Sequence, residues 1–352
     1  MNNTAILRAG LDAMYYSGAS RMLRPLWQGT GAILMLHHVR PQRPAPDGFA
    51  PNAALEIDPG FLDRVIARVL ELGYELLTFP QAIERIRSGV QHKRKFAVFT
   101  LDDGYRDNMV HAWPVFRKHN CPFTIFVAPA IAEGRCELWW KGLEAAIAAE
   151  SEINATIDGV SIQATTVTDA QKTEVFERIY WPLRSMENHA QRHWIRAFCE
   201  SAGIDLDAMC RAEAMTWSEL KTIAADPLCT IGAHTINHFT MSRLTADQAV
   251  EEATASRDEI ERRLGIRPAL FAYPYGDESS AGPRDFALIR DAGFTAAVTT
   301  RKGVITTAHR DHLTALPRVS LNGHYQKLRY LDVLLGGSVF MAWNRFKAVN
   351  VN

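Results

Sequence analysis

Short apolar runs alternate along the chain with segments of helical periodicity. The apolar runs predict buried strands over residues 32–39, 74–79, 95–104, 122–129, 229–235, 270–276, 295–300 and 313–320. Helical spacing predicts helices over residues 61–73, 80–89, 246–264 and 283–292. Strands that are apolar on both faces and alternate with helices are typical of a parallel sheet covered by helices. About eight of them predict an α/β fold in which the sheet closes, or nearly closes, into a barrel.

One region departs from this alternation and predicts an insertion. Residues 130–216 are rich in helix formers and tryptophan, and residues 153–167 have the pattern of a hairpin. We therefore expect a largely helical insertion on the barrel rim that shapes a substrate cleft. Trp139 and Trp140 fit either a platform for sugar rings or core packing. The predicted organisation is a helical extension over residues 1–31, a barrel over 32–325 that contains the insertion, and a tail over 326–352.

Composition and charge narrow the class of protein. The 352 residues include 39 basic and 39 acidic side chains, so no net charge attracts nucleic acid or anionic lipid. Five scattered cysteines without a CxxC pair argue against a disulfide framework and a cysteine zinc site. Charged residues interrupt the N-terminal segment, which lacks the apolar core of a secretory signal, and this favours the cytoplasm. The apolar, aromatic segment 330–347 with its basic end fits either packing on the domain or an interfacial membrane contact.

Polar residues follow three of the predicted strands. Asp102 and Asp103 end the first of these, in the sequence TLDDG. His234 and His238 follow the second, and their spacing predicts two imidazoles on one face of a helical turn. The third carries FAYPYGD, in which a tight turn could aim backbone N–H groups into a cleft. Because the carboxyl ends of parallel barrel strands meet at one face, these groups are expected to form one site.

Together these residues suggest metal-assisted hydrolysis. Two histidines and one carboxylate make three protein ligands and leave a zinc position open for water, although the set also accepts other divalent ions. Zinc lowers the pKa of bound water to about 7. The second carboxylate can then act as a general base, and the metal's charge offsets the repulsion between Asp102 and Asp103. A nucleobase deaminase is disfavoured because the PCxxC signature is absent from the sequence.

The order TxDDG, H[ST]xxH and FxxPxG resembles the polysaccharide deacetylases of carbohydrate esterase family 4, which share the NodB-homology fold. The resemblance runs over residues 32–320 apart from the insertion. The sequences LMLHHV and FAYPYG also resemble the branch of bacterial surface-polysaccharide deacetylases. The family implies a distorted (β/α) barrel, often with seven strands. It also implies Asp102 as catalytic base, a metal on Asp103, His234 and His238, and an oxyanion contact from the Tyr275 N–H.

The sequence departs from this family pattern in two places. Many members carry an arginine that steadies the base, where this chain has Ala272, and we predict that Arg318 supplies that charge from a neighbouring strand end. The late histidine that acts as general acid is also displaced, so His324 and His37 both remain candidates. His38 is expected to point the opposite way along the strand and to be structural.

Four further residues are predicted to contact the substrate. They are Tyr105, Asp107, Tyr273 and Pro274. For Asp107, together with Asn108, a structural role in orienting the turn after DDGY is the alternative.

The predicted function is metal-dependent removal of N-acetyl groups from amino sugars of a bacterial-type surface polysaccharide or its precursor. This reaction is hydrolysis of a carbon–nitrogen bond other than a peptide bond. The expected partner is an acetylated glycan, with no nucleic acid, and the expected cofactor is a divalent metal, zinc above others. An O-acetyl polysaccharide esterase would use the same site, and a glycan-binding barrel without catalysis is an alternative of another class.

Overall fold

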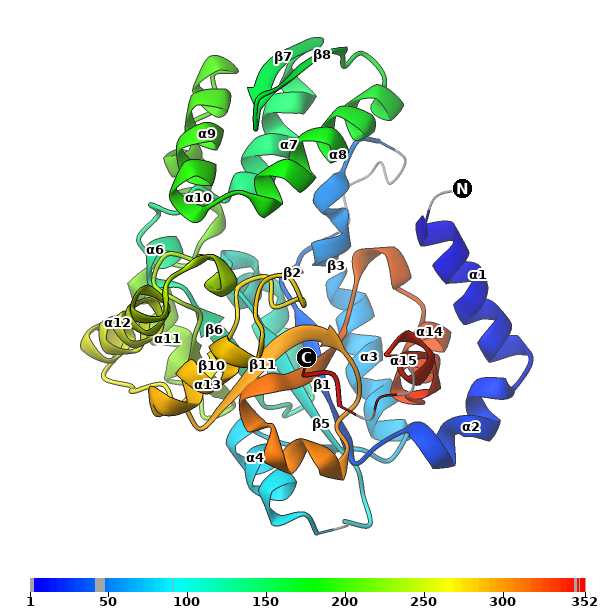
Figure 1. Cartoon of the computed structure of the whole chain (residues 1–352). Helices are drawn as coiled ribbons and strands as arrows, with labels where there is room; N and C mark the ends of the chain where they lie inside the picture. Colours follow the sequence, from blue (N-terminus) through cyan, green and yellow to red (C-terminus); the bar gives the residue numbers. More distant parts are fainter. Residues whose placement is uncertain (1–2, 42–47, 91, 345–346, 348, 352) are drawn as a thin grey trace.

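Seven parallel strands close into a barrel, which confirms the predicted α/β barrel (Figure 1). The computed structural model describes residues 3–41, 48–90, 92–344, 347 and 349–351. In order around the ring the strands are β1 (Gly31–Leu36), β12 (Leu316–Ser320), β11 (Ala296–Lys302), β10 (Leu270–Ala272), β9 (Cys229–Ala233), β6 (Phe123–Val127) and β5 (Phe96–Leu101). Strand β5 pairs with β1 and completes the ring, and the extra strand β4 (Glu75–Leu76) pairs with the start of β5.

Both faces of the barrel strands are buried, as their continuous apolar runs predict. All six residues of β1 and all six of β5 are buried. Because side chains alternate along a strand, Ile33 lies in the core inside the barrel, whereas Leu34 lies in the core between strands and outer helices. Helix α4 (Phe79–Ser88) adds Phe79 and Ile83 to the inner core, at the end where the strands begin. The opposite end, where the strands finish, remains available for a site.

Helices pack around the barrel and begin at residues that cap their first N–H groups. Thr78 and Gln81 form a capping box at the start of α4, and Thr245 and Gln248 form another at the start of α12. The four predicted helices correspond to α3, α4, α12 and α13, with boundaries within two residues of those predicted. The outer helices besides α4 are α3 (Pro59–Glu71), α5 (Trp113–Lys118), α11 (Trp217–Ala224), α12 (Ala246–Leu264) and α13 (Pro283–Asp291).

Most of the predicted strands are shorter in the structure, including those over residues 32–39 and 74–79. The run over residues 32–39 stops at Leu36 and resumes as β2 (His38–Val39), which pairs with β3 (Glu56–Ile57) away from the ring. His37 therefore lies between β1 and β2, at the carboxyl end of β1, where the predicted strand is interrupted. The run over residues 74–79 is reduced to β4, because Thr78 caps the helix that follows.

The insertion forms a largely helical layer on one side of the barrel (Figure 1). It has its own apolar core, in which Trp139 and Trp140 are only 0% and 6% exposed, so the core-packing interpretation of these two residues holds. The predicted hairpin is present as an antiparallel pair. The elements are α6 (Pro129–Ala132), α7 (Trp139–Ala149), β7 (Glu152–Ile157), β8 (Val160–Thr165), α8 (Asp169–Ser185), α9 (Asn188–Ser201) and α10 (Leu206–Glu213).

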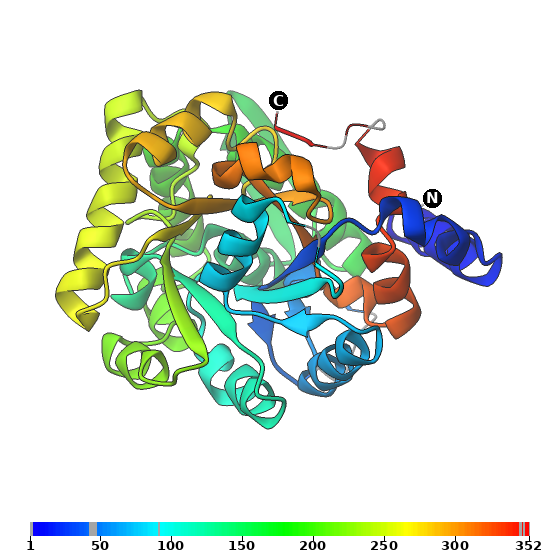
Figure 2. The ribbon, with the colours of Figure 1, turned by 90° about the horizontal axis from the view of Figure 1, so that it is seen from below.

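The two ends of the chain pack side by side on the barrel. Helices α1 (Asn3–Tyr16) and α2 (Ala19–Trp27) lie next to α14 (Leu328–Leu335) and α15 (Ser338–Trp343) (Figure 2). The C-terminal helices bury most of their large apolar side chains, including Leu331. Residues 330–343 therefore pack on the domain, which was one of the two predicted roles of segment 330–347.

Candidate active site

Both carboxylates of the DDG sequence lie at the carboxyl end of β5 and are buried. Asp102 is 1% exposed and Asp103 is 3% exposed. The Asp102 N–H continues the strand pairing by donating to Leu36 O at 3.0 Å. Asp103 and Gly104 then adopt left-handed backbone angles, with φ of 75° and 74°. The two carboxylates consequently contact different partners, Asp102 an arginine and Asp103 two histidines.

His234 and His238 lie in an irregular loop after β9, so the predicted helical turn is wrong. Thr235 and His238 have φ of 53° and 57°, and L-residues in this left-handed region do not continue a right-handed helix. Such positions cost about 1–3 kcal/mol each and persist where the surroundings enforce them. Glu252 of α12 helps to enforce the loop by accepting hydrogen bonds from the N–H groups of residues 236 and 237, at 3.1 and 3.0 Å. In this conformation both imidazoles face Asp103.

Asp103, His234 and His238 form a group that could hold a metal ion. The Nε2 atoms of His234 and His238 lie 3.3 and 3.2 Å from Asp103 Oδ1, and the three ligand atoms are all within 4.8 Å of one another. The Nδ1 of His234 donates to Ala272 O at 2.7 Å, so Nε2 is the ring nitrogen that faces Asp103 and that could bind a metal. Burial lowers the pKa of His238 to about 4, so its ring is neutral at pH 7. Within the described chain Asp103 Oδ1 has no hydrogen-bond partner, which fits a ligand atom for a divalent cation.

Two buried side chains of α9 hold the histidine loop from the insertion side. Arg192 Nη2 donates to the carbonyl oxygens of Asn237 at 3.1 Å and His238 at 3.5 Å. Asn188 accepts from the Thr240 N–H at 2.9 Å and donates to the Thr240 carbonyl at 3.2 Å. The sequence prediction missed both residues, because no motif marks them and they are distant from the loop along the chain.

Arg318 on β12 binds both oxygens of Asp102. Its Nη1 and Nη2 lie 2.8 and 2.7 Å from Oδ1 and Oδ2, and the arginine side chain is fully buried. Nε donates to Thr299 O and Nη1 also donates to Thr100 Oγ1, so the guanidinium is held on three sides. Burial alone would raise the pKa of Asp102, but the charge and hydrogen bonds of Arg318 lower it. Arg318 on β12 thus supplies the charge that the family pattern places on β10, at the position where this chain has the uncharged Ala272.

Of the two candidate acids, the structure brings His37 to the carboxylate pair. Its Nε2 lies 3.8 Å from Asp102 Oδ2, and its side chain is 19% exposed, so solvent reaches it. His324 lies on the short helix η6 (Gly323–Tyr325), and its carbonyl accepts a hydrogen bond from Arg8 of α1. In the described part of the chain, no hydrogen bond, ion pair or ring contact joins His324 to the site.

The third motif leaves one backbone N–H available at Tyr275. This residue has a φ of 62°, and its N–H donates no hydrogen bond to any described part of the protein. Its side chain is fixed, because Trp139 Nε1 donates to its hydroxyl at 2.6 Å and the Arg184 guanidinium lies 4.0 Å from its ring centroid. The ring also packs against His238, with centroids 4.9 Å apart. The insertion therefore anchors the loop while the Tyr275 N–H stays free.

Two residues predicted to bind substrate are buried instead. Tyr273 is 0% exposed and donates its hydroxyl to Thr314 O in the core. Tyr105 is 0% exposed and stacks on His38, with centroids 3.6 Å apart. Their burial corrects the predicted substrate contacts. Pro274, a third predicted substrate contact, is also buried, and its carbonyl accepts a hydrogen bond from the Gly276 N–H that closes a turn centred on Tyr275.

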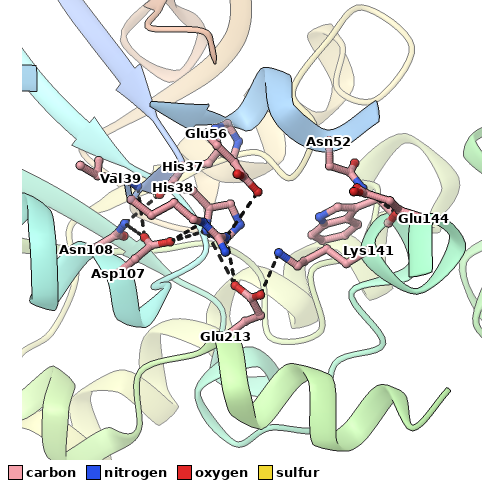
Figure 3. A network of polar contacts seen from close by, with 12 residues as sticks. His37, His38, Val39, Asn52, Glu56, Asp107, Asn108, Lys141, Glu144 and Glu213 are labelled. Atoms are coloured by element: carbon pink, nitrogen blue, oxygen red, sulfur yellow. Dashed lines mark hydrogen bonds and ion pairs between the residues drawn. The ribbon is translucent and has the colours of Figure 1, made fainter. Parts of the chain in front are cut away.

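A second polar network extends from the loop after β1 to helices of the insertion (Figure 3). His38, Asp107 and Glu213 place ligand atoms within 4.8 Å of one another. However, Arg40 lies 3.2 Å from Asp107 and 3.1 Å from Glu213, and Lys141 lies 3.0 Å from Glu213. These two side chains already neutralise the carboxylates, so the group acts as an ion-pair network and not as a metal site. It joins the loop after β1 to α7 and α10 of the insertion.

The contacts of Asp107 support its structural alternative. Its Oδ1 accepts from the Val39 N–H at 3.2 Å and from Asn108 Nδ2 at 2.9 Å. Asn108 Nδ2 also donates to the His37 carbonyl at 2.8 Å. Asp107 and Asn108 therefore fix the backbone on either side of His38, and burial raises the pKa of Asp107 to about 6.

These side chains converge where the barrel strands end, and they define a hydrolase-type site on a parallel barrel. It combines an arginine-bound carboxylate, a histidine–aspartate group suited to a metal, a solvent-accessible histidine and a free backbone N–H. The family model for polysaccharide deacetylases matches residues 89–297. The chain belongs to the polysaccharide deacetylase family, as its three motifs predict, and this membership supports deacetylase activity.

Solved structures with the same fold include several bacterial deacetylases. The deacetylase PplD of Streptococcus pyogenes, solved with acetate, is 16% identical with a TM-score of 0.57, covering 86% of this chain and 97% of its own. IcaB of Ammonifex degensii is 18% identical with a TM-score of 0.53, covering 88% and 98%. A de-N-acetylase of Aggregatibacter actinomycetemcomitans is 14% identical with a TM-score of 0.52, covering 86% and 98%. No curated protein matches the chain.

Proposed function

We propose that the chain hydrolyses N-acetyl groups on amino sugars of a bacterial-type surface polysaccharide or its precursor. The proposal rests on one observation: two neighbouring carboxylates have different partners. Asp102 is held ionised by Arg318, and Asp103 faces two histidines in a group that fits a metal. The structural likeness to a de-N-acetylase favours nitrogen over oxygen as the leaving atom.

In this proposal Asp103, His234 and His238 hold a divalent metal, zinc above others. When bound, the metal polarises the acetyl carbonyl and makes water more acidic. Asp102 takes the proton of the attacking water, and the water oxygen forms a bond to the carbonyl carbon. Arg318 keeps Asp102 ionised and fixes its orientation through two hydrogen bonds. The Tyr275 N–H donates to the oxygen that becomes negative.

His37 completes the reaction as general acid. It gives a proton to the sugar nitrogen while the carbon–nitrogen bond breaks, so that acetate and a free amine are formed. Its position near Asp102, its partial exposure and the distant location of His324 support this assignment. The bond from Asn108 Nδ2 to the His37 carbonyl holds the backbone of His37 at the carboxyl end of β1.

Acetate release from matched N-acetylated and O-acetylated glycans tests the proposal. We expect the zinc-loaded protein to release acetate from N-acetylated oligosaccharides, and we expect a chelator or Asp102→Asn to abolish release. Preferential release from O-acetylated chains would instead identify an O-acetyl esterase. Binding of glycans without acetate release from any of them would identify a glycan-binding barrel.

A further inference from the structure

Exposed hydrophobic side chains are concentrated on the two N-terminal helices. In the described part of the chain, fourteen large hydrophobic side chains are exposed, and α1 and α2 carry seven of them. The other seven are scattered singly over the remaining elements. The seven on these helices are Ile6, Leu7, Tyr15, Tyr16, Met22, Leu23 and Leu26.

One face of α1 is apolar along its length. Ile6, Ala9, Gly10, Ala13 and Tyr16 follow the spacing of residues on the same side of a helix, and all five are exposed. This face has no charged side chain. A helix on a protein surface normally presents its polar side to water. An exposed face without charges therefore indicates a surface that binds another molecule.

Helix α2 adds the most exposed apolar residues. Met22 and Leu26 are one turn apart, and their side chains are 80% and 73% exposed. Arg21 is exposed beside them, whereas Ser20 points inward and is buried. Exposed apolar side chains next to an exposed arginine are typical of helices that lie in a membrane interface.

The charge of this segment complements an anionic surface. Arg8, Arg21 and Arg24 are its three basic residues, and Asp12 is its one acidic residue. Asp12 is paired with Arg329 of α14 at 2.6 Å, so it does not offset the exposed Arg21. Arg8 and Arg24 donate to the His324 carbonyl and to Gln28 through Nε. Two copies of the chain that met through this face would bring arginines of like charge together, which disfavours a second copy as the occupant.

The two helices are too short to span a bilayer but are firmly attached to the barrel. Helix α1 has 14 residues and α2 has 9, whereas a spanning helix needs about 20. No described helix is long and apolar enough to cross a membrane. Figure 2 shows both helices projecting at the edge of the molecule beside α14 and α15. Arg8 also binds the carbonyl of His324 in the loop after β12, so α1 starts near the end of the barrel that carries the candidate site.

We propose that α1 and α2 form an interfacial anchor that docks the protein on an anionic lipid bilayer. Met22, Leu26 and the apolar face of α1 enter the boundary between headgroups and acyl chains, and the exposed Arg21 contacts lipid phosphates. The anchor lies beside the barrel, so the protein is held at the bilayer surface. The proposal is independent of the reaction that the site performs.

Sedimentation with lipid vesicles tests the anchor. The full chain is mixed with vesicles of phosphatidylcholine alone or with one third phosphatidylglycerol, at low and at high salt. We expect binding to the anionic vesicles that weakens with salt. Met22→Glu/Leu26→Glu should weaken binding at least tenfold, and Arg21→Gln should weaken it about fivefold on anionic vesicles only.

A matched control is Val160→Glu/Val167→Glu, which changes two residues of the insertion that are 61% and 71% exposed. This variant should bind vesicles like the unchanged chain, and thermal melting should show that all variants are folded. The proposal is overturned if the unchanged chain ignores anionic vesicles, or if Met22→Glu/Leu26→Glu binds them equally well. A different outcome would also overturn the proposal. If light scattering shows a dimer of the unchanged chain, if Met22→Glu/Leu26→Glu makes it monomeric, and if no vesicles are bound, the face belongs to a contact with a second copy.

Discussion

The bond between Arg318 and Asp102 joins two fully buried charges through two parallel hydrogen bonds. Such a pair is geometrically specific, because the planar guanidinium matches both carboxylate oxygens. Thr299 and Thr100 fix the far side of the guanidinium. Orientation of the carboxylate, and not only its charge, is therefore set by residue 318.

Arg318→Lys is expected to lower kcat about 100-fold, because lysine keeps the charge but cannot bind both oxygens. Metal affinity should change little, since Arg318 does not contact Asp103 or the histidines. Steady-state kinetics and metal titration on the same preparation check both parts. Arg318→Met should lower kcat further, and a variant with unchanged turnover would remove Arg318 from the mechanism. Because removal of one partner from a buried pair costs about 3–5 kcal/mol, the unfolding of each variant is measured alongside.

The two candidate acids are separated by pH–rate profiles. His37→Ala should lose the alkaline limb of the kcat/KM profile and about 100-fold in rate, because the proposed mechanism assigns the proton for the leaving amine to His37. His324→Ala should keep both limbs, since its contacts are with α1. The reverse result would assign the acid to His324 and require η6 to move.

At the scale of elements, the site depends on helices that belong to the insertion. Helix α9 binds the backbone of the histidine loop, and α7 and α8 fix Tyr275. The insertion thus supports the candidate site through side chains of three of its helices. Left-handed residues such as His238 need such support, because their conformation is unfavourable in isolation.

Arg192→Met is expected to weaken metal binding about tenfold, because the His238 carbonyl loses its donor and the loop relaxes. Arg196→Met is the matched control. Arg196 lies one turn further along α9 and also pairs with Glu137, but it does not contact the loop. Competition with a chromophoric chelator measures the affinity of both variants, and equal affinities would show that Arg192 is merely structural.

Glu213 joins α10 to the barrel loops and should make stability depend on pH. Burial raises its pKa, but Lys141 and Arg40 lower it to about 2. A carboxyl group whose pKa is lower in the folded than in the unfolded state stabilises the fold above its unfolded value of about 4.5 and loses this effect towards pH 2. Glu213→Gln should therefore lower the free energy of unfolding by about 1–2 kcal/mol at pH 7 and by much less at pH 3. Urea titrations at both pH values measure the difference, and equal losses at both would contradict the assignment.

The elements also show what local patterns can and cannot predict. Asp102, Asp103 and the two histidines were found because each follows an apolar run that forms a buried strand. The helical turn at His234 and His238 was wrong, because a four-residue spacing does not distinguish a helix from a loop with left-handed residues. Arg192 left no local signal, since its role arises only when α9 packs against a loop that follows β9.

For the whole molecule, the alternation of strands and helices was sufficient to predict the barrel, its insertion and the end at which the site lies. The overall charge was less informative. A net charge of zero gave no reason to expect attraction to anionic lipid, yet the first two helices carry three arginines and one paired aspartate. Net charge averages over the surface, whereas binding depends on one face.

A bound metal should stabilise the whole fold, because it binds the native arrangement of Asp103, His234 and His238 and not the unfolded chain. At a free zinc concentration of about 100 times Kd the gain is about 2.7 kcal/mol. This corresponds to a rise in Tm of several degrees, which calorimetry with and without chelator would measure. Asp103→Asn should remove most of this rise, and an equal rise in the variant would place the metal elsewhere.

The closure of the ring by β12 has a consequence for the newly made protein. During synthesis the ribosome releases β5 and β9 before β12, so the carboxylates and histidines exist before Arg318. A nascent chain can gather its metal ligands, but it cannot orient Asp102 until the last barrel strand has paired with β1. The orientation of Asp102 is thereby one of the last features of the barrel to form during synthesis, after the strands that carry Asp103, His234 and His238.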